Sequence, residues 1–100
     1  MKLVTNTIGT IENPSVEDIR RSFHDDMEDV AGNLYALYKE NGDSIHSISG
    51  HMLQKFSLSI SDPNAKTKTV SRGLRRDSVE EYFVCFYLGD DSWKSELQWE

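Results

Sequence analysis

The sequence predicts a single α+β domain over residues 1–100, with a mostly antiparallel sheet and helices packed on one of its faces. Helix-start signals followed by apolar residues appear twice, near Ser15 and near Ser78. The segments between them are short, rich in Thr, Val, Ile and aromatic residues, and separated by turn sequences. The last eight residues alternate between apolar and polar. The expected order of elements is therefore β-α-β-β-β-β-α-β.

The N-terminal part predicts a short strand and then an amphipathic helix. Lys2–Ile11 has strand composition, with an interruption at Gly9. Ser15 and Asp18 have the spacing of a helix cap. One apolar stripe at helical spacing follows, formed by Val16, Ile19, Phe23, Met27 and Val30. The helix should end near Gly32-Asn33, with Arg20 and the acidic side chains on its outer face.

The middle of the chain predicts four strands. Leu34–Lys39 and Ser44–Ser49 flank Asn41-Gly42, a dipeptide typical of a type I′ hairpin turn, and Gly50 suggests a bulge. The next pair is Phe56–Ser61, which alternates cleanly, and Thr67–Ser71, joined by a turn at 62–65.

The C-terminal part carries the strongest local pattern. Ser78 and Glu81 have the form of a capping box, and Gly89 is a typical helix-ending residue. The apolar run Tyr82–Leu88 between them fits either a buried helix or a buried strand, and the acidic first turn favours the helix. Trp93–Glu100 alternates with period two, which predicts a closing strand with its two tryptophans on the inner side.

Composition restricts the function. Apolar content is 37%, charged content is 28%, the formal net charge is −6 and there is one cysteine. No segment approaches the roughly 20 apolar residues of a membrane span, and the first residues lack the apolar stretch of a signal peptide. The negative charge argues against direct nucleic-acid binding and suits a basic partner. A cytoplasmic protein is expected.

Residues that carry chemistry are sparse. His24, His46 and His51 show no metal-ligand spacing, and Cys85 lies in an apolar run that favours a buried thiol over a nucleophile. No phosphate-binding glycine motif is present. We therefore expect no enzyme activity, no metal and no cofactor, although a ligand pocket between sheet and helices remains an alternative.

Two acidic groups and several aromatic residues are candidates for partner binding. The candidate set is Asp25, Asp26, Glu28, Asp29, Asp90, Asp91 and Trp93. The carboxylates could form an anionic patch, or they could be solvated surface charge. Trp93 is expected to be more open than Trp99, although core positions are favoured for both. Tyr35 and Tyr38 lie three apart and so face opposite sides of a strand, which leaves one of them available as an anchor. The basic cluster of Arg72, Arg75 and Arg76 is expected to pair with nearby acids.

The C-terminal pattern resembles a family of bacterial immunity proteins, which bind and block polymorphic toxins. The resemblance rests on Ser78, Glu81, Phe86, Gly89 and Trp99, together with the helix opening at Asn13–Ile19. It implies a cognate toxin of the deaminase or nuclease type, basic at its substrate cleft, whose active site the protein occludes. The alternative is a small regulatory or structural module, with homodimer formation through an exposed sheet edge.

Overall fold

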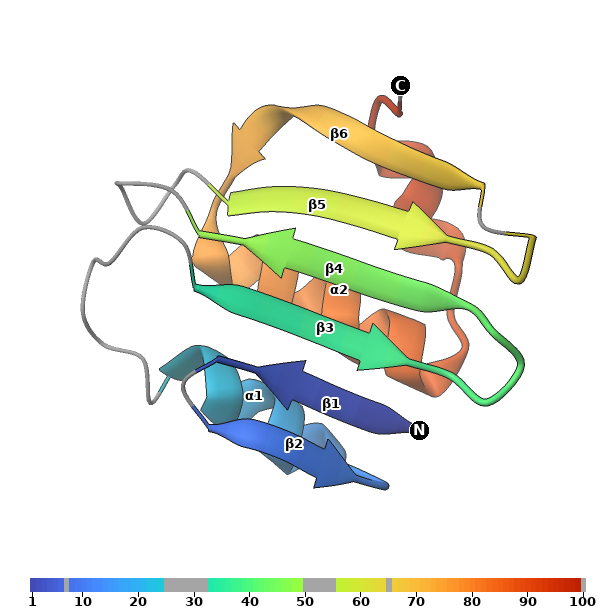
Figure 1. Cartoon of the computed structure of the whole chain (residues 1–100). Coiled ribbons are helices and arrows are strands. Elements are labelled where there is room, and N and C mark those ends of the chain that lie inside the picture. Colours follow the sequence, from blue (N-terminus) through green and yellow to red (C-terminus); the bar gives the residue numbers. More distant parts are fainter. Residues whose placement is uncertain (7, 25–32, 50–55, 65, 100) are drawn as a thin grey trace.

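The structure, a computed structural model, describes residues 1–6, 8–24, 33–49, 56–64 and 66–99, and forms one α+β domain (Figure 1). Its strands are β1 (Lys2–Thr5), β2 (Gly9–Glu12), β3 (Leu34–Tyr38), β4 (Ser44–Ile48), β5 (Phe56–Ser61) and β6 (Thr67–Leu74). They form a six-stranded sheet in the order β2-β1-β3-β4-β5-β6, and all neighbours are antiparallel. The helices α1 (Val16–His24) and α2 (Arg76–Leu88) cover one face. The predicted fold class is confirmed.

The first predicted strand is in fact a hairpin. The chain reverses after Thr5, so that Thr5 faces Gly9 across β1 and β2. Gly9 has a φ of +96°, a conformation that side chains disfavour, and the Ile8 N–H donates to Thr5 Oγ1 at 2.9 Å. The expected interruption at Gly9 is therefore the point where the chain enters a second strand.

The predicted cap of α1 is confirmed. The Ser15 N–H donates to Asp18 Oδ2 at 2.9 Å, and the Asp18 N–H donates to Ser15 Oγ at 3.1 Å. These reciprocal bonds satisfy N–H groups that a helix start leaves without partners. Ile19 and Phe23 are fully buried, as the apolar stripe predicts. The rest of that stripe, Met27 and Val30, lies outside the described residues.

The β3–β4 hairpin is confirmed, but its turn is not of type I′. Only Gly42 has a positive φ, of +99°, whereas a type I′ turn requires one at Asn41 too. The Gly42 N–H donates to the Lys39 carbonyl at 3.2 Å, and the Lys39 N–H donates to the Asp43 carbonyl at 2.8 Å. This is a three-residue loop in which a glycine follows a tight turn. The bulge expected at Gly50 lies outside the described residues.

The run Tyr82–Leu88 is helical, and Gly89 ends it with a φ of +81°. The capping box at Ser78 is not formed, because α2 begins at Arg76 and its N-cap, Arg75, has no side-chain capping bond. Glu81 instead accepts a bond from Arg20 of α1 at 2.6 Å. The Glu81 carboxylate, which the capping box would have bonded to the Ser78 N–H, is therefore engaged in an ion pair with Arg20 of the other helix.

The predicted closing strand is reduced to one isolated bridge between Val70 and Trp99. Ser92–Glu96 forms a 3-10 helix, η1, in which the Lys94 N–H donates to the Asp91 carbonyl at 3.1 Å. Trp93 in η1 and Leu97, the extended residue that follows it, are nevertheless both buried. The C-terminal segment therefore joins the core by a different backbone path.

The core lies between the helices and the inner face of the sheet. Its centre is aromatic: the ring of Phe23 stacks on Tyr35 at 4.3 Å and meets Phe83 edge-on at 5.1 Å. Alternate residues of each strand point into this layer. The side chains that fill it include Leu3, Leu37, Ile45, Leu58, Val70, Val79 and Phe86. No helix among the described residues covers the opposite face of the sheet.

Candidate functional site on the open face of the sheet

Of the predicted partner-binding residues, the structure describes Asp90, Asp91 and Trp93, whereas Asp25, Asp26, Glu28 and Asp29 lie outside the described residues. Asp90 and Asp91 follow the C-terminal end of α2.

Asp90 and Asp91 are exposed and belong to the turn between α2 and η1. The Ser92 N–H donates to Asp90 Oδ1 at 2.9 Å, and this bond to the backbone holds the pKa of Asp90 below its ordinary value. Asp91 pairs with Lys94 at 2.9 Å. Both carboxylates therefore have structural roles that explain their presence.

Trp93 is a core residue, and the expectation that it is the more open tryptophan is wrong. It is 3% exposed and stacks on Tyr82 at a ring distance of 5.1 Å. Trp99 is the half-buried one, and its Nε1 donates to the Lys94 carbonyl at 2.8 Å. Two members of the basic cluster have partners. Arg75 pairs with Asp77 at 3.4 Å, as expected, and Arg76 Nη1 donates to the Phe23 carbonyl at 3.3 Å.

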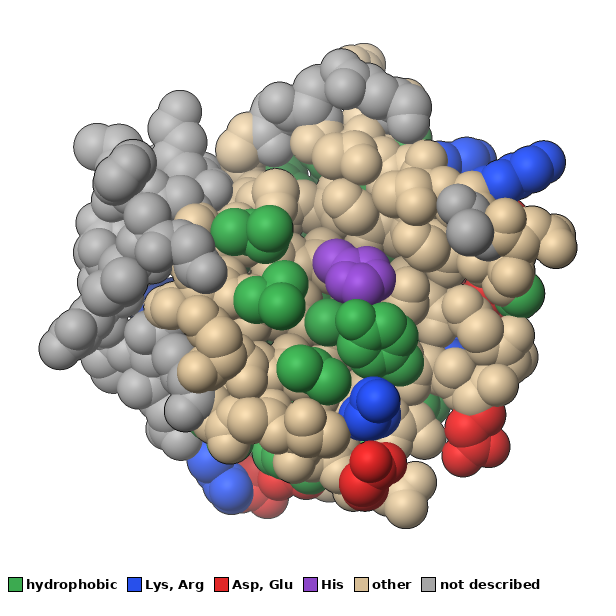
Figure 2. All heavy atoms as spheres, viewed as in Figure 1, with side chains coloured by type: hydrophobic (Ala, Val, Ile, Leu, Met, Phe, Trp, Pro, Cys, Tyr) green, Lys and Arg blue, Asp and Glu red, His purple; other side chains and the backbone are tan. Residues whose placement is uncertain are grey.

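One face of the sheet points away from both described helices. The register places Val4, Ala36, His46 and Ser59 in one row across four strands on this face. Figure 2 views the molecule from this side and shows hydrophobic side chains gathered beside a histidine in its middle. No described helix covers these side chains.

The apolar half of the open face lies over β1, β3 and β4. Ile48 is 50% exposed and Tyr38 is 38% exposed, and Val4 and Leu34 are half-buried beside them. The Tyr38 ring meets His46 edge-on at 5.3 Å. We call Val4, Leu34, Tyr38, His46 and Ile48 the apolar patch. Tyr35 is 1% exposed, so the prediction that the two tyrosines point to opposite sides is confirmed.

The other half of the open face, over β5 and β6, is lined by hydroxyl groups that bond to one another. Ser59 and Thr69 lie 3.1 Å apart, Ser61 and Thr67 lie 2.9 Å apart, and Ser57 Oγ accepts the Ile48 N–H at 3.0 Å. The clean alternation of Phe56–Ser61 predicts this serine row. A partner would therefore meet an apolar surface next to a polar rim, the usual arrangement of a protein interface.

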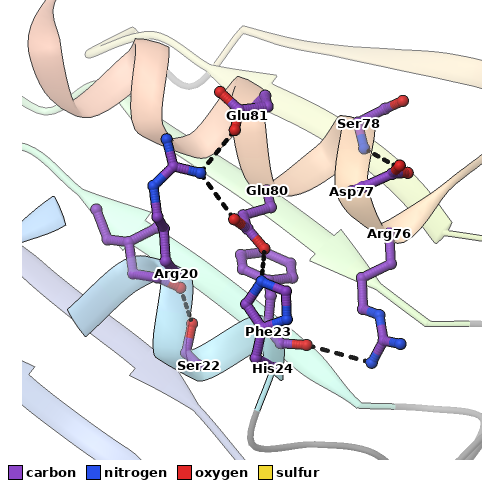
Figure 3. Close-up of polar contacts among 10 residues, drawn as sticks. Arg20, Ser22, Phe23, His24, Arg76, Asp77, Ser78, Glu80 and Glu81 are labelled. Atoms are coloured by element: carbon purple, nitrogen blue, oxygen red, sulfur yellow. Dashed lines mark hydrogen bonds and ion pairs between the residues drawn. The ribbon is translucent and has the colours of Figure 1, made fainter. Parts of the chain in front are cut away.

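On the helix side, Glu80 of α2 is buried and joins the two helices (Figure 3). Its Oε2 accepts a bond from Arg20 at 2.8 Å, and its Oε1 contacts His24 Nε2 at 2.7 Å. Arg20, which was expected on the outer face of α1, also bonds Glu81 of α2. Sequence reasoning missed Glu80, because its partners are about 60 positions away.

This network joins α1 and α2. The described residues contain no group of three or more His, Cys, Asp or Glu side chains placed to hold a metal ion. Burial raises the pKa of the Cys85 thiol, which disfavours the reactive thiolate. Burial also lowers the pKa of His46, so its ring is held neutral on the open face.

Comparisons with known proteins define no relative. No protein-family model matches the chain, and neither the curated proteins nor the solved structures contain a match. Among the described residues, neither helix is long and apolar enough to cross a bilayer. The structure is that of a small α+β domain with one sheet face that no described helix covers.

Proposed function

We propose that this protein is a non-catalytic cytoplasmic immunity protein that binds a cognate toxin of the deaminase or nuclease type and occludes its active site. The toxin class comes from the resemblance of the C-terminal pattern. The apolar patch is the observation that carries the binding role. Tyr38 of β3 and Ile48 of β4 expose large apolar side chains on two neighbouring strands. They do so on a chain in which 28% of residues are charged.

An exposed apolar patch with a polar rim favours a protein partner over a small ligand. Sheet faces are shallow, whereas small-molecule sites are concave. Tyrosine is a frequent anchor because it offers a large contact area with little conformational freedom to lose. The edge-on contact with His46 holds the Tyr38 ring in place before a partner arrives. This preorganisation lowers the entropic cost of binding.

The test measures the affinity of surface variants for the toxin domain encoded beside this gene, by calorimetry or biolayer interferometry. Ile48→Lys should weaken binding by about tenfold or more, as for a central interface residue. Leu88→Lys is the matched control, because Leu88 is 66% exposed on α2, away from the open face. Equal affinity of the Ile48→Lys variant and the original protein would reject the patch as the binding surface.

Charge is the second part of the proposal. A net charge of −6 should steer the protein toward a basic cleft, so the association rate should fall as salt is raised. Replacing Asp25, Asp26, Glu28 and Asp29 together by alanine should weaken binding while leaving the domain folded. An association rate that is independent of salt would remove the acidic residues from the interface.

A homodimer is the second candidate function, and the edge of the sheet is the observation that favours it. β2 is an edge strand with no described strand on its outer side, whereas the outer side of β6 meets Trp99. Unpaired edges are templates for pairing with another chain. Sedimentation across a range of concentrations tests this: a dimer that Thr10→Lys dissociates would support edge pairing, and a monomer would reject it.

A further inference from the structure

A hollow on the helix side gathers four lysines at one corner of the domain. Both the β3–β4 and the β5–β6 hairpins turn at the end of the sheet where α2 stops (Figure 1). Between them lies a cavity of about 450 Å³, lined by Asp43, Ile60, Ser61, Asp62, Lys66, Lys68, Phe86 and Lys94. This volume lies within the range of small-molecule sites, roughly 300–1,000 Å³. Lys39 borders the hollow, since its Nζ lies 4.3 Å from the centre of the Phe86 ring.

The strand register explains why lysines lie here. Lys68 of β6 faces Ile60 of β5, so it is on the core side of the sheet, in line with Val70 two residues further on. Lys66 precedes Lys68 by two residues. α2 ends at Leu88, and Lys94 of η1 lines the hollow beyond that end. The inward side of β6 thus changes from apolar to cationic where the helix ends.

Two of these cations have no carboxylate partner. Among the described residues no ion pair involves Lys66 or Lys68, whereas Lys94 pairs with Asp91 at 2.9 Å. The two lining aspartates are engaged locally. Asp62 Oδ1 accepts the N–H groups of Asn64 and Lys66 at 3.0 and 2.9 Å, and Asp43 Oδ2 accepts the Asn41 amide at 3.1 Å. The lining side chains carry three ammonium groups against two carboxylates, so the hollow has a net positive charge on a protein of net charge −6.

We propose that this hollow binds a small organic phosphate. Ammonium groups from three different elements surround a space in which a dianion would gain charge-assisted hydrogen bonds. Ile60 and Phe86 offer an apolar wall for the organic part. The site is distinct from the proposed partner-binding face, because it lies on the side of the sheet that carries the helices.

Two structural roles compete with ligand binding. Inward-pointing lysines on an edge strand prevent sheets from pairing edge to edge, and β6 is an edge strand. Cations also stabilise a helix C-terminus, and α2 has no basic residue in its last turn. Both roles predict changes in association state or stability, and neither predicts saturable binding of a phosphate. The ligand experiment therefore separates them.

The experiment titrates the protein at low salt with phenyl phosphate, inorganic phosphate and phenol, followed by NMR. We expect saturable binding of phenyl phosphate, weaker binding of inorganic phosphate and none of phenol. The double variant K66Q/K68Q should lose phenyl phosphate affinity by about tenfold or more, while K2Q, a lysine on the open face, should not. Circular dichroism and sedimentation check that both variants stay folded and unassociated.

Four results would overturn the proposal. The first is the absence of saturable phenyl phosphate binding by the original protein. The second is equal affinity in K66Q/K68Q. The third is self-association of K66Q/K68Q when the original protein binds no phenyl phosphate. That result would mean that the two lysines prevent edge-to-edge pairing of the sheet. Equal affinity for phenyl phosphate and inorganic phosphate would also overturn it, because the apolar wall would then contribute nothing.

Discussion

Replacing Glu80 by alanine should destabilise the protein far more than the same change at the adjacent Glu81. Both carboxylates bond the same guanidinium, at 2.8 Å from Glu80 and 2.6 Å from Glu81. They differ in burial: the side chain of Glu80 is 7% exposed, and that of Glu81 is 57% exposed. The pair therefore compares one ion-pair chemistry in two environments.

The expected loss for Glu80→Ala is about 2 kcal/mol in the free energy of unfolding. Breaking a fully buried ion pair costs about 3–5 kcal/mol, because the remaining charge stays buried. Here the side chains of Arg20 and His24 are 40% and 64% exposed, so water can solvate them once Glu80 is gone. What remains is the loss of bonds to a charged group, about 1.5–3 kcal/mol.

Glu81→Ala should cost less than about 0.5 kcal/mol, as exposed ion pairs do. Alanine is the best helix former, so neither loss would come from helix propensity. Urea unfolding gives both free energies. At about 4–8 °C per kcal/mol for a domain of this size, Glu80→Ala should also lower the Tm by about 10 °C.

Equal losses in the two variants would refute this account of α1–α2 packing. A double-mutant cycle with Arg20→Ala adds a second criterion. The coupling between Arg20 and Glu80 should exceed that between Arg20 and Glu81, because burial strengthens the bond. The opposite order would mean that Glu80 contributes only through its methylene groups.

The other predictions concern one helix end, one helix start and one titration. Gly89→Ala should cost about 1 kcal/mol by thermal unfolding, because the added Cβ meets no atom within 4 Å and only the φ of +81° is strained; no loss would show that the turn relaxes freely. Ser15→Ala should cost about 1 kcal/mol in the free energy of unfolding, because the cap of α1 is lost. Asp18→Asn should destabilise the protein less at acidic pH than at neutral pH, because a bond from the Ser15 backbone lowers the pKa of Asp18 from 3.8 and its stabilising effect is lost as pH falls through that lowered value. A loss of stability that does not change with pH would contradict this. The original protein should lose stability as pH falls below 6.5, because the half-buried His46 ring takes up its proton at lower pH than the unfolded chain does. His46→Gln should reduce that loss, and parallel plots of stability against pH for the two proteins would reject this role of His46.

Local signals were sufficient for most of the fold. The Ser15–Asp18 cap, Gly89 and the alternation of Phe56–Ser61 each describe interactions within a few residues, and each is confirmed. The choice of a helix for Tyr82–Leu88 was also correct, although the capping box at Ser78 that favoured it is not formed. Short-range patterns work here because the interactions they encode are made in the final structure.

Competition with distant groups explains where sequence reasoning was wrong. Glu81 satisfies the spacing of a capping box, yet Arg20 of α1 binds it, and no pattern around position 81 contains that information. The alternation after Trp93 places Ser95 on the same side as Trp93 and Leu97, whereas in the structure Trp93 and Leu97 are buried and Ser95 is exposed. Only the bonds around Asp91 and Lys94 decide between the two backbones.

The candidate site was less predictable than the fold. The tyrosine spacing in β3 indicated that one ring faces outward, but the strand order that places Tyr38 beside His46 is a property of the whole sheet. The residues selected from the sequence as binding residues were chosen by charge and aromatic character. Burial then removed Trp93 from that set.

The division of the sheet into two faces makes the binding proposals testable without unfolding the protein. Side chains on the helix side, such as Leu37 and Ile45, have no exposed surface, so substitutions there would change stability and binding together. Tyr38 and Ile48 alternate with them along the same strands and are 38% and 50% exposed, so their replacement removes less buried area than a change at Leu37 or Ile45. A loss of partner affinity in an Ile48 variant of unchanged stability can therefore be assigned to the surface itself, and the same reasoning applies to Lys66 and Lys68 at the corner hollow.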